Sequence, residues 1–148
     1  MTLRPATAAD AHAMATIHRQ AMRVSLSFLP ELHTAEEDLW FMGERLLKEF
    51  EAWVAEEAGK VVAYVAFSPD WVQHLYVHPD HQGRGMGPAL LEVALADGRG
   101  KRLWTFQQNQ RARKFYEDRG FLIETLTDGE GNEEKTPDVL YVRPGQTG

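Results

Sequence analysis

A glycine-rich loop between an apolar strand and an apolar helix is the feature that most restricts how this chain can fold. Residues 81–88 read HQGRGMGP, after a predicted strand at 71–77 and before an apolar helical run at 89–94. Glycine lets the backbone approach a ligand closely, and a helix N-terminus offers free N–H groups and the positive end of the helix dipole. Pro88 suits a first helical turn, where its missing N–H costs nothing. The alternative is a tight surface turn, but the position between strand and helix favours an anion site.

Two common phosphate-binding motifs do not match this loop. A nucleoside triphosphate loop needs Gly-Lys followed by Ser or Thr, and residues 83–88 contain no such run. A dinucleotide-binding loop needs a third small residue where Pro88 stands, and an acidic residue about 20 positions later. Gln107 and Gln108 lie there instead. Both interpretations are therefore rejected.

The alternation of patterns along the chain predicts one mixed α/β sheet covered by helices. A capping pair at Thr7 and Asp10 predicts a first helix from Ala8, and Thr34 with Glu37 predicts a second. The order is β-α-α-β-β-β-α-β-α-β-β, within a single domain at residues 1–148. The predicted strands lie at 3–6, 52–55, 61–67, 71–77, 102–107, 121–126 and 139–142, and the later helices follow the glycine loop and span about 111–119.

Composition narrows the function classes. The formal net charge is −6, which disfavours binding to nucleic acid or to an anionic membrane surface. The chain has no cysteine, no visible secretory signal and no apolar run of membrane-spanning length, so we expect a cytoplasmic protein.

His78 and His81 have the spacing of a metal pair on a helix, but Pro79 between them forbids that helix. We therefore predict no metal site, and interpret the acidic run at 128–134 as a solvated connection.

Three segments together resemble the GNAT superfamily of N-acetyltransferases. They are LRPATAADA near the N-terminus, HLYVHPDHQGRGMGPALL around the glycine loop, and NQRARKFYEDRGF at residues 109–121. The second contains the family's Gln-x-x-Gly-x-Gly loop, and the third its Asn-x-x-Ala-x-x-Phe-Tyr-x-x-x-Gly-Phe element. The resemblance covers almost the whole chain. It implies a mostly antiparallel sheet of about seven strands flanked by about four helices, and transfer of an acetyl group from acetyl-CoA to an amine within a ternary complex.

The resemblance also implies where acetyl-CoA binds. The backbone N–H groups from about Gln82 to Gly87 hold the pyrophosphate, and the backbone around Leu75 and Val77 pairs with the pantetheine arm like an added strand. Arg84 adds a positive charge, unless it is only a solvated loop residue. The implied set is Leu75, Tyr76, Val77, Gln82, Gly83, Arg84, Gly85, Met86, Gly87, Asn109 and Tyr116.

The catalytic residues are less well defined by the sequence. Tyr116 matches the family's general acid, which protonates the departing CoA thiolate; packing beside its neighbours is the alternative. On the central strand, we expect Gln73 to face the site and to orient a water or the amine. His74 then points to the other face as a buried, hydrogen-bonded histidine. His33 is a candidate general base, although a surface histidine is the better explanation of it.

The acceptor side is predicted from the segment that spans the first two helices. The resemblance places Phe28, His33, Trp40 and Phe41 over the acyl end of CoA, where they form an aromatic-walled pocket for the amine of a small molecule. Two alternatives stay open: a non-catalytic module that binds acyl-CoA, and acetylation of a protein N-terminus or lysine. A homodimer is also left open.

Overall fold

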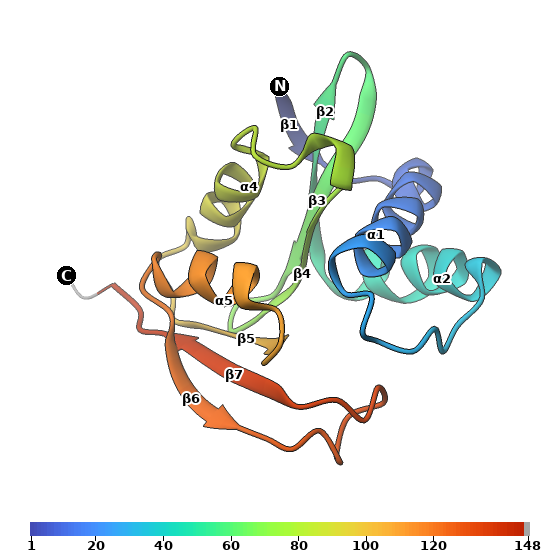
Figure 1. Ribbon diagram of the computed structural model, residues 1–148. Coiled ribbons are helices and arrows are strands. Elements are labelled where there is room, and N and C mark those ends of the chain that lie inside the picture. Colours follow the sequence, from blue (N-terminus) through green and yellow to red (C-terminus); the bar gives the residue numbers. More distant parts are fainter. Residues whose placement is uncertain (147–148) are drawn as a thin grey trace.

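The computed structural model describes residues 1–146 of the 148-residue chain. Its elements follow the predicted order, and Figure 1 shows how they are arranged. The strands are β1 (Thr2–Pro5), β2 (Glu51–Glu57), β3 (Lys60–Phe67), β4 (Val72–Val77), β5 (Lys101–Phe106), β6 (Leu122–Leu126) and β7 (Asp138–Arg143). The helices are α1 (Ala11–Ser25), α2 (Ala35–Phe41), α3 (Leu47–Glu49), α4 (Met86–Leu95) and α5 (Gln110–Glu117), with 3-10 turns at Ala8–Asp10 and Pro79–His81 and a π-helical turn at Met42–Leu46.

The mixed α/β fold class is confirmed, but its seven strands form two antiparallel sheets where a single sheet was expected. One sheet has the order β1-β2-β3-β4 and the other the order β5-β7-β6. A single parallel bridge between Trp71 and Arg102 connects them, just before β4 and at the start of β5. Beyond this bridge β4 and β5 separate. Within residues 1–146, β4 therefore pairs with β3 along one edge and leaves its other edge open.

Strand β3 lies at the centre of two apolar cores. Alternate side chains point to opposite faces of a strand, so Ala63 and Val65 pack toward α4 while Tyr64 and Ala66 pack toward α1. All of them are fully buried. Figure 1 shows α1 and α2 on one side of this sheet and α4 on the other. Helices thus cover both faces of the sheet, and the open edge of β4 lies between the two helical layers.

Ion pairs hold the start of the chain in place. The Arg4 guanidinium donates two hydrogen bonds of 2.8 Å to the Asp10 carboxylate and one of 2.6 Å to Glu56 on β2. Asp10 also accepts from the Thr7 backbone, which completes the predicted capping box. The Arg4 side chain keeps the pKa of Asp10 below its ordinary value, even though burial acts the other way. The second predicted capping box, Thr34 with Glu37, is also present.

Candidate active site

The glycine loop has the backbone conformation that its sequence requires. Gly83 and Gly85 have φ angles of 80° and 84°, in the left-handed region that other residues enter only at a cost. Gly85 is the N-cap of α4, and no atom lies within 4 Å of where its Cβ would be. Since the first N–H groups of a helix have no partner within it, Met86 and Gly87 present free donors here.

A groove of about 420 Å³ runs from this loop along the open edge of β4. It brings together all the residues predicted to bind CoA except Arg84. The groove lies between β4 and α5, the helix that follows β5 after β4 and β5 have separated beyond the bridge between the sheets. Its lining is Ala21, Ser25, Leu26, Leu75, Tyr76, Val77, His81, Gln82, Gly83, Gly85, Met86, Gly87, Pro88, Asn109, Arg111, Ala112, Phe115, Tyr116 and Arg119.

Arg84 differs from its prediction. Its guanidinium donates to the Glu57 carboxylate at 3.0 Å, and the side chain does not line the groove. Two other arginines, Arg111 and Arg119, do line the groove. Arg111 donates to the Gln82 side-chain oxygen at 2.6 Å, and Arg119 stacks 4.0 Å from the Phe115 ring centre. Both lie in the segment 109–121 that resembles the family, but nothing in its pattern specifies where their side chains point.

On β4, the side chains of Leu75 and Val77 pack into the core with α4. The groove is therefore lined mainly by the backbone of Leu75 and Val77, on the open edge of the strand. At the start of α5, the Asn109 side chain caps the helix by accepting from the Ala112 N–H at 3.2 Å. Asn109 thus has a structural role in addition to its place in the groove.

Tyr116 lies at the inner wall of the groove. Its ring packs against Phe115 and Phe121, with ring centres 5.1 and 5.4 Å away. Burial, with a smaller contribution from the nearby Tyr76, raises the pKa of the Tyr116 phenol above its ordinary value. The phenol is consequently protonated throughout the physiological pH range and has a proton to give.

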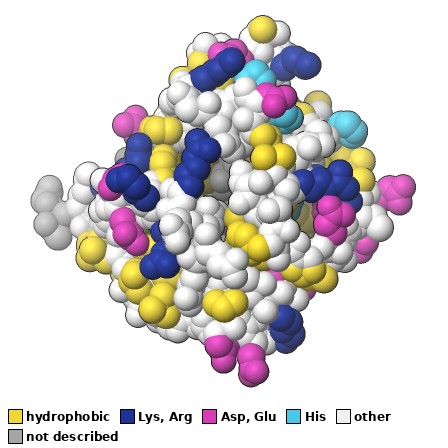
Figure 2. All heavy atoms as spheres, in the orientation of Figure 1, with side chains coloured by type: hydrophobic (Ala, Val, Ile, Leu, Met, Phe, Trp, Pro, Cys, Tyr) yellow, Lys and Arg dark blue, Asp and Glu magenta, His cyan; other side chains and the backbone are white. Residues whose placement is uncertain are grey.

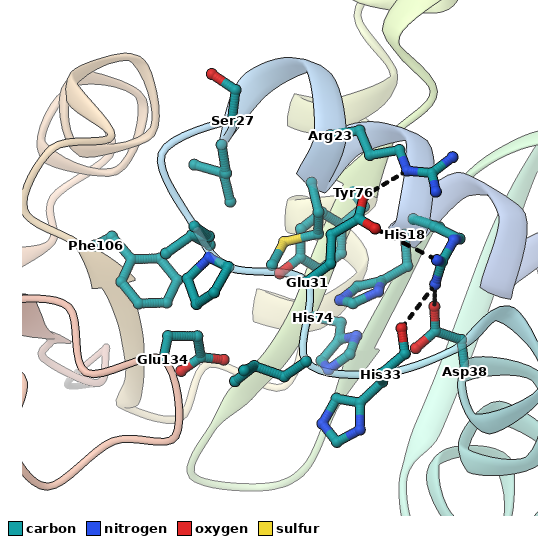
Figure 3. A pocket seen from close by; sticks show the side chains of 16 residues that line it. His18, Arg23, Ser27, Glu31, His33, Asp38, His74, Tyr76, Phe106 and Glu134 are labelled. Carbon is teal, nitrogen blue, oxygen red and sulfur yellow. Dashed lines mark hydrogen bonds and ion pairs between the residues drawn. The ribbon is translucent and has the colours of Figure 1, made fainter.

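A second cavity of about 370 Å³ adjoins the groove, and Leu26 and Tyr76 line both. Figure 3 shows this cavity, with Tyr76, His18 and His74 along one side and Phe106 and Glu134 on another. It is formed by α1, the segment between α1 and α2, Asp38 on α2, β4, Phe106 at the end of β5, and the connection before β7. The lining is His18, Arg19, Met22, Arg23, Leu26, Ser27, Leu29, Pro30, Glu31, Leu32, His33, Asp38, His74, Tyr76, Phe106 and Glu134.

The structure corrects the expected facing of β4. Gln73 lies toward Ser68, whose hydroxyl is 3.4 Å from its amide, and it lines neither the groove nor the second cavity. His74 and Tyr76 line the second cavity instead. The strand alternates as predicted, but the side of the sheet that bears the cavity is the α1 side. His74 is nevertheless hydrogen-bonded as expected, with Nδ1 2.9 Å from the Tyr64 hydroxyl.

A cluster of aromatic rings forms the wall of the second cavity nearest the groove. The His18 ring stacks on His74 at 5.2 Å and meets the edge of Tyr76 at 4.8 Å. Burial, reinforced by the neighbouring His18, lowers the pKa of His74 to about 3, so His74 is neutral. Burial raises the pKa of Tyr76 to about 12. Near neutral pH, His74 and Tyr76 in this wall are therefore uncharged, and only protonation of His18 would place a charge there.

Three of the four residues predicted for the acceptor pocket, His33, Trp40 and Phe41, line one hollow, and Phe28 does not. Only His33 lines the second cavity. Phe28 packs edge-on against Phe106 at 6.3 Å, outside the lining. The hollow lined by Trp40 and Phe41 adjoins the second cavity, because both are lined by His18, His33, Asp38, His74 and Glu134. The aromatic walls of the second cavity come instead from Tyr76 and Phe106, which the sequence pattern did not single out.

His33 is poorly suited to accept a proton. Its Nε2 lies 2.6 Å from a Glu133 oxygen and its Nδ1 lies 3.6 Å from Glu37. Burial alone would lower the pKa of His33, but these two carboxylates outweigh it and raise the pKa. His33 is therefore charged over more of the pH range than an ordinary histidine.

Charged side chains line the outer part of the second cavity. Arg23 donates to Glu31 at 2.7 Å, and Arg19 lies 3.7 Å from the same carboxylate. Arg19 also donates to Asp38 at 2.9 Å and to the His33 carbonyl at 3.1 Å. Figure 3 shows these interactions as dashed lines. Glu31 thus demonstrates that a carboxylate fits between the two guanidinium groups.

Two further observations concern metals and membranes. Among residues 1–146, no three His, Cys, Asp or Glu side chains gather as a metal site would require. The His78 ring accepts a hydrogen bond from the Asp80 N–H at 3.1 Å, an ordinary turn contact. Within the same residues, no helix combines the length and the apolar character needed to span a membrane.

Comparison with known proteins identifies the fold and the family. Residues 48–123 match the model of the acetyltransferase (GNAT) domain. The chain is 33% identical to the L-amino acid N-acyltransferase MnaT of Escherichia coli K12, over 83% of this chain and 80% of that protein. It is 30% identical to the L-methionine sulfoximine/L-methionine sulfone acetyltransferase of Salmonella typhimurium, over 83% and 81%.

Solved structures match over nearly the full length. YjaB from Escherichia coli, in its apo form, superposes with a TM-score of 0.78 at 21% identity, covering 98% of both chains. The putative acetyltransferase yncA from Salmonella typhimurium, solved with acetyl-CoA, superposes with a TM-score of 0.75 at 22% identity, covering 100% of this chain and 96% of that one.

Proposed function

The chain belongs to the GNAT family of acetyl-CoA-dependent N-acetyltransferases, and we propose that its acceptor is the amino group of a small molecule bound in the second cavity. One observation carries the proposal: the groove and the second cavity adjoin at Tyr76 and Leu26. A thioester at the inner end of the groove then faces an amine in the second cavity. Figure 2 supports a small acceptor, because charges of both signs are mixed over the visible face with no broad docking patch.

We propose that acetyl-CoA lies along the groove with its pyrophosphate at the N-terminus of α4. The free N–H groups of Met86 and Gly87 and the helix dipole favour an anion there. Arg111 on α5 and Arg119, just after α5, supply positive charge from the opposite wall. The pantetheine arm pairs with the open edge of β4, as an added strand does.

In the proposed reaction the acceptor nitrogen attacks the thioester carbon directly. A new C–N bond forms, the C–S bond breaks, and the thiolate leaves. An N–H group on the open edge of β4 polarises the carbonyl oxygen as negative charge develops on it. Tyr116 gives its proton to the sulfur. Burial raises the pKa of the Tyr116 phenol and also makes a buried thiolate more basic, so the donor and the acceptor of this proton shift in the same direction.

We propose further that the acceptor resembles an amino acid. Arg19 and Arg23, one turn apart on α1, hold the Glu31 carboxylate at the cavity's outer part. An acceptor's carboxylate can take this position. Apolar side chains of Met22, Leu29 and Phe106 line the remaining space and favour an apolar side chain. The names of the two relatives, an L-amino acid N-acyltransferase and an L-methionine sulfoximine/sulfone acetyltransferase, point the same way.

A matched pair of acceptors tests this function. Release of CoA is measured with L-leucine and with leucinamide, which lacks the carboxylate, and with a lysine-containing peptide. We expect acetylation of L-leucine with a lower KM than leucinamide. In Arg23→Gln the KM for leucine should rise about tenfold, in keeping with a lost charged hydrogen bond, while that for the amide stays unchanged. Arg45→Gln is the control, since Arg45 pairs with Glu49 away from both cavities.

The peptide decides between the acceptor classes. Acetylation of the peptide but of neither small amine would contradict a small-molecule acceptor and favour a protein lysine or N-terminus. The cytoplasmic location, the single domain at residues 1–148 and the homodimer stay predictions.

A further inference from the structure

We propose that His18 is the group that takes the proton from the acceptor amine. This inference rests on the proposed function, because it assumes an amine in the second cavity. None of the residues singled out from the sequence supplies a suitable base: Gln73 does not line the cavity, and His33 is paired with two carboxylates. His18 gave no sequence signal beyond a position on the first helix.

The position of His18 is the first argument. It comes from the inward side of α1 and lines the second cavity. Its ring is fixed by stacking on His74 and by the edge of Tyr76, 4.8 Å away. Since Tyr76 lines both the groove and the second cavity, a ring in contact with Tyr76 lies near the point where thioester and amine must meet. Figure 3 shows His18 in this wall of the cavity.

The protonation state of His18 is the second argument. Burial lowers the pKa of His18 below its ordinary value, while Asp38 on α2 partly opposes this effect. His18 is therefore neutral near pH 7 and able to accept a proton, and Asp38 stabilises the imidazolium once it forms. The titratable and charged groups that line the second cavity with His18 are Arg19 and Arg23 on α1, Glu31 and His33 before α2, Asp38 on α2, His74 and Tyr76 on β4, and Glu134 before β7. The adjoining hollow, which His18 also lines, adds Glu36 and Glu37 on α2 and Glu133 before β7.

The neighbouring candidates fit less well. A general base works best when its pKa is near the working pH. His74, with a pKa of about 3 and Nδ1 in contact with the Tyr64 hydroxyl, is too weak a base. Tyr76, with a pKa of about 12, is protonated at neutral pH and cannot accept a proton.

The protons balance as follows. An ammonium group cannot attack, so His18 takes one of its protons and leaves a neutral amine. The nitrogen bonds to the thioester carbon, the C–S bond breaks, and Tyr116 protonates the sulfur. The second proton that the nitrogen loses passes through solvent to the Tyr116 oxygen. His18 then releases its proton to solvent, so the turnover yields one amide, one CoA thiol and one free proton.

The test compares His18→Gln with His12→Gln in the full chain. His12 lies on the same helix but is exposed and lines neither cavity. With saturating acetyl-CoA and L-leucine, kcat is measured from pH 5 to 9. In the wild type and in His12→Gln, kcat should rise with pH to a plateau, with an apparent pKa below the ordinary histidine value of about 6.5. In His18→Gln the plateau should fall by about 100-fold or more, and the acidic limb should vanish.

Two further measurements separate chemistry from structure. Acetyl-CoA affinity by calorimetry should be the same in His18→Gln and the wild type, and added imidazole should restore turnover to His18→Ala. Wild-type turnover that persists in His18→Gln, with its acidic limb intact, would overturn the role of His18 and leave the proposed function standing. A loss of turnover in His18→Gln with the limb retained would also overturn it and indicate a packing role. A wild-type protein that acetylates no amine would contradict the proposed function, and the role of His18 with it.

Discussion

The Arg111 guanidinium donates a 2.6 Å hydrogen bond to the side-chain oxygen of Gln82 and so joins α5 to the glycine loop across the groove. Both residues lie in the motifs that resemble the family, but 29 positions apart in sequence. The contact brings a positive charge to the proposed pyrophosphate position from an element other than the loop itself. It also distinguishes Arg111 from Arg84, which lies in the loop and turns away to Glu57.

The first prediction compares these two arginines. Arg111→Gln should weaken acetyl-CoA binding by about three- to tenfold, since it removes one partly exposed charge beside the phosphates. Arg84→Gln should leave the affinity within twofold of the wild type, because its guanidinium pairs with Glu57 outside the groove lining. Isothermal titration calorimetry with acetyl-CoA measures both. A larger loss in Arg84→Gln than in Arg111→Gln would contradict the placement of the phosphates.

The second prediction concerns the helix cap at Gly85. Its φ angle of 84° penalises any residue with a Cβ, although open space surrounds the site. Gly85→Ala should therefore lower the free energy of unfolding by about 1–2 kcal/mol and weaken acetyl-CoA binding, because the N–H donors lose their alignment. The control is Gly131→Ala, at a position with equally open space and no left-handed backbone. Urea denaturation of both variants measures the difference. Equal stability in the two variants would contradict a strained cap.

The sequence predicted the fold well, and all but one of the residues that it assigned to CoA line one groove, because both depend on local patterns. The strand before the loop, the glycines and the helix after it are consecutive, and their pattern fixes the conformation of Gly83 and Gly85. The open edge of β4, however, arises from the split between two sheets at the Trp71–Arg102 bridge. No local pattern in either segment specifies where two sheets separate.

The second cavity was predicted poorly for the same reason. Its lining comes from separated parts of the chain, and side-chain direction decides which residues belong. Alternation on β4 correctly divided Gln73 from His74, but the sequence could not tell which side of the sheet α1 and α2 would cover. The buried ring contacts of His18 depend on α1 crossing β4, which is a tertiary feature.

The third prediction concerns stability at acidic pH. His74 has a folded-state pKa of about 3, below its value in the unfolded chain, so the unfolded state binds the extra proton. Stability should consequently fall as pH decreases below about 6.5, by up to about 1.4 kcal/mol per pH unit from this group. Urea denaturation between pH 5 and 7.5 measures the slope, which should decrease in His74→Gln and remain in the exposed control His12→Gln. An unchanged slope in His74→Gln would show that His74 is not buried in its neutral form.

The last prediction tests Tyr116 as the proton donor to the thiolate. Tyr116→Phe keeps the ring that packs against Phe115 and Phe121 but removes the hydroxyl. Turnover should fall by about 100-fold or more while acetyl-CoA affinity stays near the wild-type value, because the lost interaction acts in the transition state. The control is Tyr141→Phe. The Tyr141 hydroxyl donates a 2.5 Å hydrogen bond to Glu117, and Tyr141 does not line the groove, so this change should affect stability rather than kcat. Both variants are measured for kcat with L-leucine and for acetyl-CoA affinity on the same preparation. Wild-type kcat in Tyr116→Phe would mean that water protonates the sulfur and that the tyrosine only packs the inner wall of the groove.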